Sequence, residues 1–208
     1  MSYTTDFMRL KCAGDVLNIA GPMKAPDKEI SESMAVIRHL KSIALKEPMQ
    51  WTLYDMCAGN ALTSLIAVHL LPFKKAIAVD KRERYRKWEN AKRFTYLNYD
   101  IKKIKNNLKL WQKSDVPEKA IIIGVHACQS LANDIIDIYN KSDASHLILM
   151  PCCIGQITIS VPDFFRERLG KYWIWTWQLS QRCEGKVSIH EDKKILSPCN
   201  AIITASKF

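Results

Sequence analysis

Short apolar runs alternate with longer amphipathic stretches through most of the chain. Five runs predict strands, because each is short, apolar or aromatic, and closed by a polar or turn-forming residue; they cover residues 51–54, 75–79, 95–99, 120–125 and 146–150. Between them, apolar positions recur at helical spacing, which predicts helices over residues 62–71, 83–92 and 130–139. Alternating strands and helices favour a mostly parallel sheet with right-handed crossovers and helices on both faces.

The two ends of the chain complete this pattern. A helix is expected over about 27–46, after an irregular segment at residues 1–26. A helix over about 162–170 precedes two extended runs, 186–190 and 201–205, which are joined without a long helix between them. We therefore expect an α/β, Rossmann-like fold whose mostly parallel seven-stranded sheet ends in an antiparallel closing strand. Such an ending is typical of methyltransferase sheets and not of dinucleotide-binding sheets.

No internal repeat, low-complexity tract or Gly/Ser-rich linker divides the sequence. We therefore expect a single domain over residues 1–208, with an N-terminal helical cap segment at 1–50 and a Rossmann-like core at 51–208. A chain of 208 residues is long enough to bury a sizeable core without disulfides.

Composition excludes several protein classes. Hydrophobic residues make up 48% of the chain and charged residues 25%, which is the balance of an ordinary globular protein. The best apolar stretch, 61–73, is broken by His69 and Pro72, so no run reaches the roughly 18–20 residues that a membrane helix needs. The N-terminus lacks the pattern of a secretory signal, so we expect a cytoplasmic location without membrane association. The seven cysteines include no C-x-x-C pair and are expected to be reduced thiols.

Positive charge is concentrated in one segment. The formal net charge is +10, and the stretch from Lys81 to Lys113 alone contains twelve Lys/Arg against three acidic residues, interleaved with aromatic residues. A solvated helix face is the alternative, but a uniform basic bias would not cluster in this way, so we predict RNA binding. No DNA-specific motif is present. The candidate RNA-binding residues are Arg82, Arg84, Arg86, Lys87, Lys92 and Arg93.

Chemically distinctive residues follow the predicted strands, at the edge where ligands bind in such sheets. The turn Asp55–Asn60 contains Gly59, which allows a ligand to approach the backbone. Asp80 follows Gly59 by 21 residues and is placed to accept hydrogen bonds from ribose hydroxyls, while Asp100 is placed to bind an adenine amino group. A single glycine disfavours a pyrophosphate-containing cofactor such as NAD and favours S-adenosylmethionine (SAM). The predicted cofactor-binding residues are Asp55, Cys57, Ala58, Gly59, Asn60, Asp80, Lys81, Asp100, Ile101 and His126.

Five segments occur in the order seen in one family: Asp55–Asn60, Val79–Arg82, Tyr99–Ile101, Gly124–Cys128 and Met150–Cys153. The chain resembles the class I SAM-dependent methyltransferases, in particular the eukaryotic tRNA 2′-O-methyltransferases that modify the acceptor stem, and their methyltransferase-like relatives. The resemblance covers about residues 27–208, and its most specific part is the His-x-Cys and Cys-Cys pair. It implies in-line methyl transfer to a tRNA-like RNA. Gln129 replaces a glycine of many relatives, and the extra zinc-binding segments of the tRNA enzymes are absent, so the resemblance does not define the substrate.

Three residues are candidates for catalysis. His126 is the best general base at the predicted edge of the sheet, although a merely hydrogen-bonded histidine is an equal alternative. Cys152 and Cys153 are expected to shape the substrate pocket, or one of them acts as a nucleophile, as in RNA cytosine-5 methyltransferases.

Other functions remain open at this point. The protein could be a non-catalytic RNA-binding protein on a methyltransferase scaffold. Zinc could be held by a soft ligand set at the same strand ends, namely Cys57, His126, Cys128, Cys152 and Cys153. Because the cofactor needs the same crevice, no metal is predicted.

Overall fold

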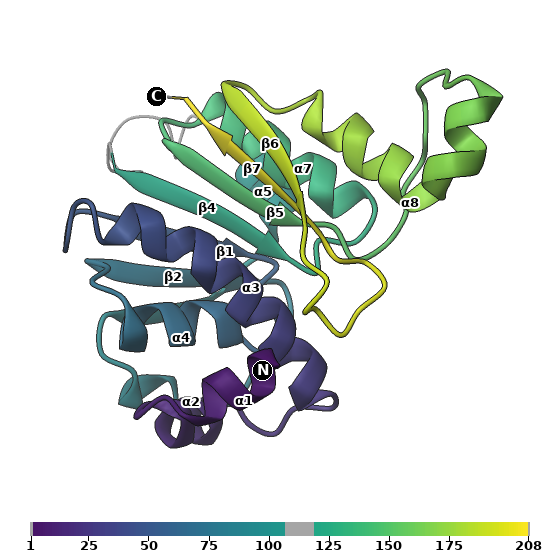
Figure 1. The fold of residues 1–208 in the computed structure, drawn as a ribbon. Helices are drawn as coiled ribbons and strands as arrows, with labels where there is room; N and C mark the ends of the chain where they lie inside the picture. The colour runs from purple at the N-terminus through teal and green to yellow at the C-terminus, as the bar shows by residue number, and fades with distance from the viewer. Residues whose placement is uncertain (1, 107–118, 208) are drawn as a thin grey trace.

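The computed structural model describes residues 2–106 and 119–207, which form a seven-stranded sheet flanked by helices (Figure 1). The strands are β1 (Thr52–Met56), β2 (Lys75–Asp80), β3 (Phe94–Asn98), β4 (Ala120–Val125), β5 (His146–Met150), β6 (Lys186–Glu191) and β7 (Ala201–Ser206). Their order across the sheet is β3-β2-β1-β4-β5-β7-β6. Strand β7 is antiparallel to both of its neighbours, and the other pairs are parallel. The predicted fold is confirmed.

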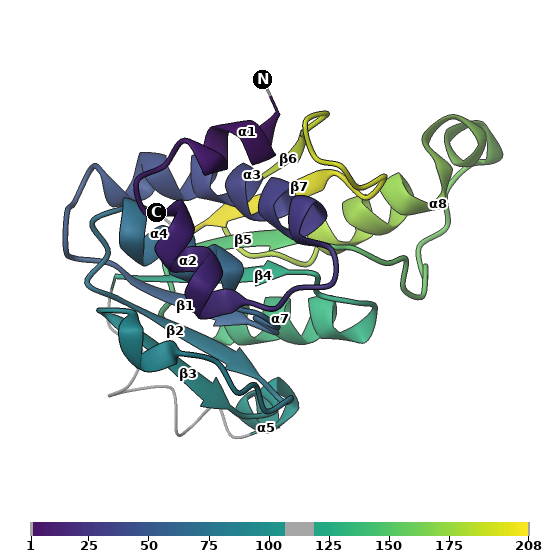
Figure 2. The same cartoon turned by 90° about the horizontal axis from the view of Figure 1, so that it is seen from below.

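Helices cover both faces of the sheet (Figure 2). They are α1 (Tyr3–Met8), α2 (Ala13–Ala20), α3 (Pro26–Ala44), α4 (Leu62–Leu70), α5 (Ile101–Asn106), α7 (Ser130–Lys141) and α8 (Asp163–Ser180), with a 3-10 turn, η1, at Trp88–Asn90. Helices α1 to α4 bury their apolar residues in one core, and α5, α7 and α8 bury theirs in the other. None of the helices in the described ranges is long and apolar enough to cross a membrane.

The central strands show why the apolar runs of the sequence locate this sheet. Every residue of β1 and β4 is buried, as expected for parallel strands that are covered by helices on both faces. Such strands appear in the sequence as continuous apolar runs, and the predicted bounds of β4 and β5 agree with the structure residue for residue.

The N-terminal segment differs from expectation. Residues 1–26 were expected to be irregular, but they include the helices α1 and α2. The hydroxyl of Ser2 accepts a hydrogen bond from the backbone N–H of Thr5 and caps α1. Tyr3 and Phe7, one turn apart, are buried on the same side of that helix. Packing of this apolar face stabilises a helix that would be too short to persist in isolation.

The prediction of a basic helix over residues 83–92 is wrong. The only regular structure there is the single turn η1. Side-chain contacts hold the segment in this path: Trp88 donates its indole N–H to the carbonyl of Arg84 (3.0 Å), and its ring stacks on that of Tyr96 of β3 with 4.7 Å between the ring centroids. The local pattern of charges could not indicate these contacts.

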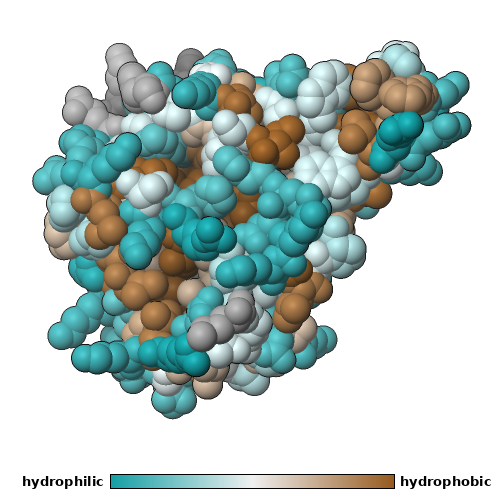
Figure 3. All heavy atoms as spheres, viewed as in Figure 1, coloured by the Kyte–Doolittle hydropathy of each residue, from teal (hydrophilic) through white to brown (hydrophobic). Residues whose placement is uncertain are grey.

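The C-terminal helix is longer than expected. The sequence predicted its end near Gly170, but α8 continues to Ser180 after a kink at this glycine, whose φ is +71°. A positive φ is readily adopted by glycine, so the kink separates two helical halves. The second half buries Ile174, Trp175 and Leu179 in the core. The first half projects from the body of the protein as an arm (upper right in Figures 1 and 3), where hydrophobic side chains reach the surface.

Candidate functional site

A large cleft lies at the C-terminal ends of β1, β2 and β4, and α3 closes one side of it. Its volume is about 860 Å³, within the range of small-molecule sites. The strand order reverses between β1 and β4, and this is the point at which open α/β sheets bind ligands. Most of the predicted cofactor-binding residues line the cleft: Cys57, Ala58, Gly59, Asn60, Asp80, Lys81, Asp100, Ile101 and His126.

The turn after β1 presents its backbone to the cleft in an unusual conformation. Cys57, Gly59 and Ala61 all have positive φ, at 62°, 56° and 53°. Two of them carry a side chain, and strained backbone of this kind clusters at functional sites. The turn is tied to β2, because Ala58 N–H donates to the carbonyl of Val79 (3.0 Å) and Gly59 N–H donates to the carboxylate of Asp80 (2.9 Å).

Asp80 is one of the carboxylates of the cleft wall, and it accepts a hydrogen bond from the turn after β1. Burial alone would raise its pKa, but hydrogen bonds from the side chain and backbone of Arg82 and from Gly59 N–H lower the pKa below the ordinary value. The backbone N–H of Arg82 lies 2.8 Å from one oxygen, and its Nε lies 3.2 Å from the same oxygen. The Arg82 side chain is 60% exposed. It can therefore withdraw and leave an ionised acceptor that backbone groups hold in place.

Asp100 and Ile101 form another part of the wall, at the start of α5. The backbone N–H of Lys102 donates to Asp100 at 2.9 Å, so the carboxylate also caps this helix. Asp80 and Asp100 thus border the same cleft, as the sequence predicted for the two carboxylates expected to bind ribose and adenine.

Asp55 occupies a different position from these two. It is 1% exposed and lies behind the cleft wall, where it accepts a hydrogen bond from the hydroxyl of Ser64 at 2.8 Å. Its other oxygen has no partner among the described residues. Burial raises the pKa of Asp55 to about 7, and the hydrogen bonds from Ser64 oppose this shift. Asp55 is therefore not part of the cleft lining, which includes the turn Cys57–Asn60 that follows it.

Asn60 gives a direct test of whether the cleft suits a nucleoside cofactor. Its amide nitrogen donates to the carboxylate of Glu29 on α3, at 2.9 Å from the nearer oxygen. Its carbonyl oxygen is buried in the cleft wall, and no residue within the described ranges satisfies it. A buried acceptor without a partner is costly unless a ligand supplies a donor. The unpaired amide oxygen and the carboxylates of Asp80 and Asp100 fit a ligand that carries hydroxyl and amino donors.

His126 makes a contact that the sequence did not reveal. Its Nε2 lies 2.8 Å from Oε2 of Glu32, a fully buried residue of α3. The contact is an N···O approach and not a hydrogen bond, because neither oxygen of Glu32 has a hydrogen-bond partner among the described residues. His126 also has a positive φ of 64°, so its backbone is strained. In the sequence, Glu32 is marked only as a charged residue shortly before the apolar run 34–37 of the predicted helix.

Three thiols gather beside the cleft, where β4 and β5 end. The Sγ atoms of Cys128 and Cys152 are 2.9 Å apart, Cys153 lies 3.5 Å from Cys128, and Cys152 and Cys153 are 3.7 Å apart. Cys128 lines the cleft itself. Burial raises the pKa of Cys128 and of Cys152. Raised pKa values disfavour the thiolate that a nucleophile requires.

The predicted RNA-binding residues divide into two groups. Arg82, Arg84 and Arg86 line the cleft, while Lys87 and Lys92 are exposed on the adjoining segment. The guanidinium of Arg86 also donates to the carbonyls of Ala20 (3.0 Å) and Pro22 (3.1 Å).

Arg93 is anchored in a similar way, with its guanidinium donating to the carbonyls of Val68 and Phe73. It therefore has a structural role in addition to any contact with RNA. Part of the basic segment, including Lys109 and Lys113, lies outside the described residues.

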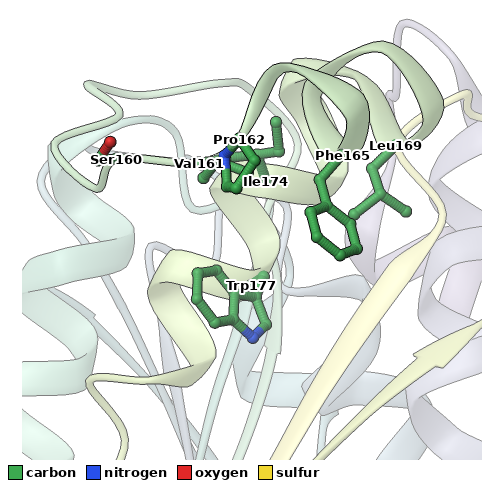
Figure 4. Close-up of a pocket in the computed structure, with 7 residues that line it drawn as sticks. All are labelled: Ser160, Val161, Pro162, Phe165, Leu169, Ile174 and Trp177. Carbon is green, nitrogen blue, oxygen red and sulfur yellow. The ribbon is translucent and has the colours of Figure 1, made fainter.

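A second hollow of about 370 Å³ lies between α8 and the loop before it (Figure 4). Its lining is almost entirely apolar: Ser160, Val161, Pro162, Phe165, Leu169, Ile174 and Trp177. It contains no ionisable side chain, and none of its residues lines the larger cleft. Of these two hollows, the larger cleft is therefore the one that offers an acid, a base or a charged binding group.

One comparison with a solved structure shows the same fold. The CurJ carbon methyltransferase aligns with a TM-score of 0.52 at 14% identity, over 86% of this chain and 54% of that one. An uncharacterised protein from Listeria monocytogenes (TM-score 0.46, 13% identity, 82% and 67% of the two chains) is similar. So is TrmK of M. capricolum, solved in complex with S-adenosylhomocysteine (0.44, 13%, 81% and 67%). At these identities the likeness concerns the fold alone.

None of the curated proteins compared with this chain matches it. A family of methyltransferase domains, in contrast, matches residues 27–159, which include α3, the first five strands and the whole cleft turn. The match confirms the predicted enzyme class and its cofactor, SAM; the tRNA 2′-O-methyltransferase family remains a prediction. The chain belongs to the methyltransferase-domain family.

Proposed function

We propose that this methyltransferase acts on RNA, with a tRNA-like molecule as its substrate. The observation that carries the proposal is the charge of the cleft lining, which contains six cationic side chains and three carboxylates. The cations are Lys24, Lys28, Lys81, Arg82, Arg84 and Arg86. Lys87 and Lys92 extend the positive surface beyond the cleft. A cationic border of this kind suits a polyanionic substrate, because phosphate contacts supply most of the affinity for nucleic acids.

The residues that would hold SAM are those of the cleft wall. Asp80 is suited to the ribose hydroxyls, Asp100 to the adenine amino group, and the turn Cys57–Asn60 allows close approach of the cofactor to backbone. SAM supplies a methyl group on a positively charged sulfur, and the carbon of this methyl group is open to in-line attack by a nucleophile. The protein's task is therefore to align the substrate and, for a hydroxyl nucleophile, to accept its proton.

His126 is the residue that we propose for proton acceptance. Its Nε2 lies 2.8 Å from Oε2 of Glu32, and in the proposed state this nitrogen carries the proton. In the neutral imidazole the lone pair is then on Nδ1, and this nitrogen is the one able to accept a proton. Glu32 fixes the tautomer and stabilises the imidazolium that forms, as a buried carboxylate does beside a catalytic histidine. Glu32 is thus a positioning residue, and His126 is the catalytic one.

The Cys nucleophile of a cytosine-5 mechanism is less well supported than this base. A thiol attack requires a thiolate, and burial raises the pKa of Cys152, one of the two candidate nucleophiles, and of its neighbour Cys128. We therefore favour a hydroxyl or amine of RNA as the methylated group.

The test uses the full chain, radiolabelled SAM and fractionated cellular RNA, followed by identification of the modified nucleoside. We expect label in the tRNA fraction, and His126→Ala should lower incorporation at least about 100-fold while SAM affinity changes little. The charge reversals Arg84→Glu and Lys87→Glu should weaken RNA binding and reduce its salt dependence. The matched control is Lys186→Glu, at the exposed start of β6 and far from the cleft lining. Label found only in protein or small molecules would refute the RNA substrate.

A further inference from the structure

The three thiols beside the cleft form a group that methyl transfer does not use. The Sγ atoms of Cys128, Cys152 and Cys153 all lie within 4.8 Å of one another. All three side chains are partly buried. They come from the ends of two adjacent parallel strands, whose register pairs Val125 with Met150. The sheet itself therefore brings them together, although 24 residues separate Cys128 from Cys152.

Hydrogen bonds fix the backbone on both sides of this group. The carbonyl of Cys128 accepts from Leu131 N–H at 3.0 Å, at the start of α7. The hydroxyl of Tyr172 donates to the carbonyl of Pro151 at 3.0 Å and accepts from Ala201 N–H at 3.0 Å. The thiols are therefore attached to a framework that is already ordered. A preorganised framework is what a metal site needs from its protein.

The spacing of the sulfurs can be compared with that of a zinc site. Zinc–thiolate bonds of about 2.3 Å in tetrahedral geometry place two sulfurs about 3.8 Å apart. The distances from Cys153 to Cys128 and from Cys152 to Cys153, 3.5 and 3.7 Å, are close to this value. Cys128 and Cys152, at 2.9 Å, would have to separate by about 0.9 Å. Rotation of one side chain supplies such a change without moving the backbone.

We propose that Cys128, Cys152 and Cys153 bind one Zn²⁺ ion as three thiolates beside the cofactor cleft. Soft sulfur ligands in a compact set select zinc over magnesium or calcium. Binding forms three Zn–S bonds and releases the three thiol protons to solvent, with no change of oxidation state. The site is independent of the proposed RNA substrate.

This ligand set is smaller than the one that the sequence suggested. Cys57 lies within the turn that forms the cofactor wall, and His126 is engaged with Glu32. Without these two residues, Cys128 is the one member of the ligand set that lines the cofactor cleft. Three protein ligands leave the fourth tetrahedral position to water or substrate, which is the arrangement of catalytic zinc sites. Since Cys128 lines the cleft, this position would be next to the substrate.

The test uses the full-length protein, stripped of metal and kept reduced with a phosphine, and titrated with Co²⁺ alone. We expect one equivalent to bind, with the charge-transfer absorption of a tetrahedral cobalt–thiolate site, and Zn²⁺ to displace it. Replacing Cys128, Cys152 or Cys153 singly by serine should weaken binding at least about 100-fold, because changes outside the ligand shell already cost 10- to 100-fold.

Two other cysteines provide matched controls. Cys183→Ser removes a thiol at the end of α8, and Cys199→Ser removes one before β7 that is not part of the three-thiol group. Both variants should keep the cobalt spectrum. Absence of the spectrum in the reduced native chain, or its loss in either control, overturns the proposal.

A second measurement needs no substitution and so does not depend on the folding of a variant. Zn²⁺ should protect Cys128, Cys152 and Cys153 of the native chain from alkylation, as read by mass spectrometry. The labelling of Cys183 should be unchanged. Equal labelling of all four cysteines with and without Zn²⁺ contradicts the site.

Discussion

The buried carboxyl of Asp55 should make the stability of the fold depend on pH. Asp55 is fully buried behind the cleft wall, and only Ser64 donates to it among the described side chains. Burial raises its pKa to about 7, compared with about 3.9 in an unfolded chain. Asp55→Asn keeps the shape of the side chain and removes the titration.

The sign of the effect follows from where the proton is held. Between about pH 4 and pH 7 the folded chain holds this proton and the unfolded chain has lost it, so stability falls as pH rises through this window. Above about pH 7 both states are ionised and the penalty is complete. Within this window each pH unit lowers the free energy of unfolding by about 1.36 kcal/mol, because one proton separates the two states. Between pH 4 and pH 7 the free energy of unfolding of the native chain should therefore fall by up to about 4 kcal/mol relative to that of Asp55→Asn.

Urea unfolding of the two proteins, followed by tryptophan fluorescence from about pH 4 to pH 8, measures this difference. Subtracting the two free energies of unfolding removes the titrations that both proteins share. Ser64→Ala provides a matched variant, because it keeps the carboxyl and removes a donor that lowers its pKa. The upper limit of its window should rise, because the folded-state pKa increases while the unfolded-state pKa stays the same. A difference between the native chain and Asp55→Asn that stays constant, or that grows in favour of the native chain with pH, would refute the burial argument.

Three further outcomes are expected. Asp80→Asn should weaken SAM binding by about 10- to 100-fold in calorimetric titration, since hydrogen bonds to a charged group are worth about 1.5–3 kcal/mol; unchanged affinity would mean that Asp80 does not contact the cofactor. Glu32→Gln should lower kcat at least about tenfold with little change in SAM affinity, because the imidazolium of His126 loses its counter-charge; an unchanged kcat would leave Glu32 a structural role only. Gly155→Ala places a Cβ 2.6 Å from the ring of buried Trp175 and should destabilise the fold by about 1–3 kcal/mol in thermal unfolding, whereas an unchanged Tm would show that the loop yields freely.

The sequence predicted the sheet well because its central strands are covered on both sides. The runs that form β4 and β5 are almost wholly apolar, so their bounds could be read without knowledge of the fold. The same reasoning located the cleft, because parallel strands that end in Asp80 and His126 bring these residues to one edge.

Contacts between distant segments could not be predicted in this way. Glu32 meets His126 across 94 positions of the sequence, and Arg86 is anchored to carbonyls of the α2–α3 connection. Neither pairing has a local signature. The basic segment after β2 was wrongly predicted to be a helix because its charges do not indicate that the ring of Trp88 stacks on that of Tyr96 in the next strand.

The ion pair between Arg82 and Asp80 joins a cation of the cleft lining to the carboxylate that we propose for ribose binding. In the structure, the guanidinium neutralises the carboxylate that suits ribose. If ribose hydroxyls replaced Arg82 as donors to this carboxylate, the Arg82 guanidinium would keep an unpaired positive charge available to the substrate. Phosphate would then be attracted more strongly to the protein with its methyl donor in place, and by thermodynamic reciprocity bound RNA would tighten the hold on the donor by the same factor. A single arginine would in this way favour assembly of the complete complex over binding of the methyl donor or the RNA alone.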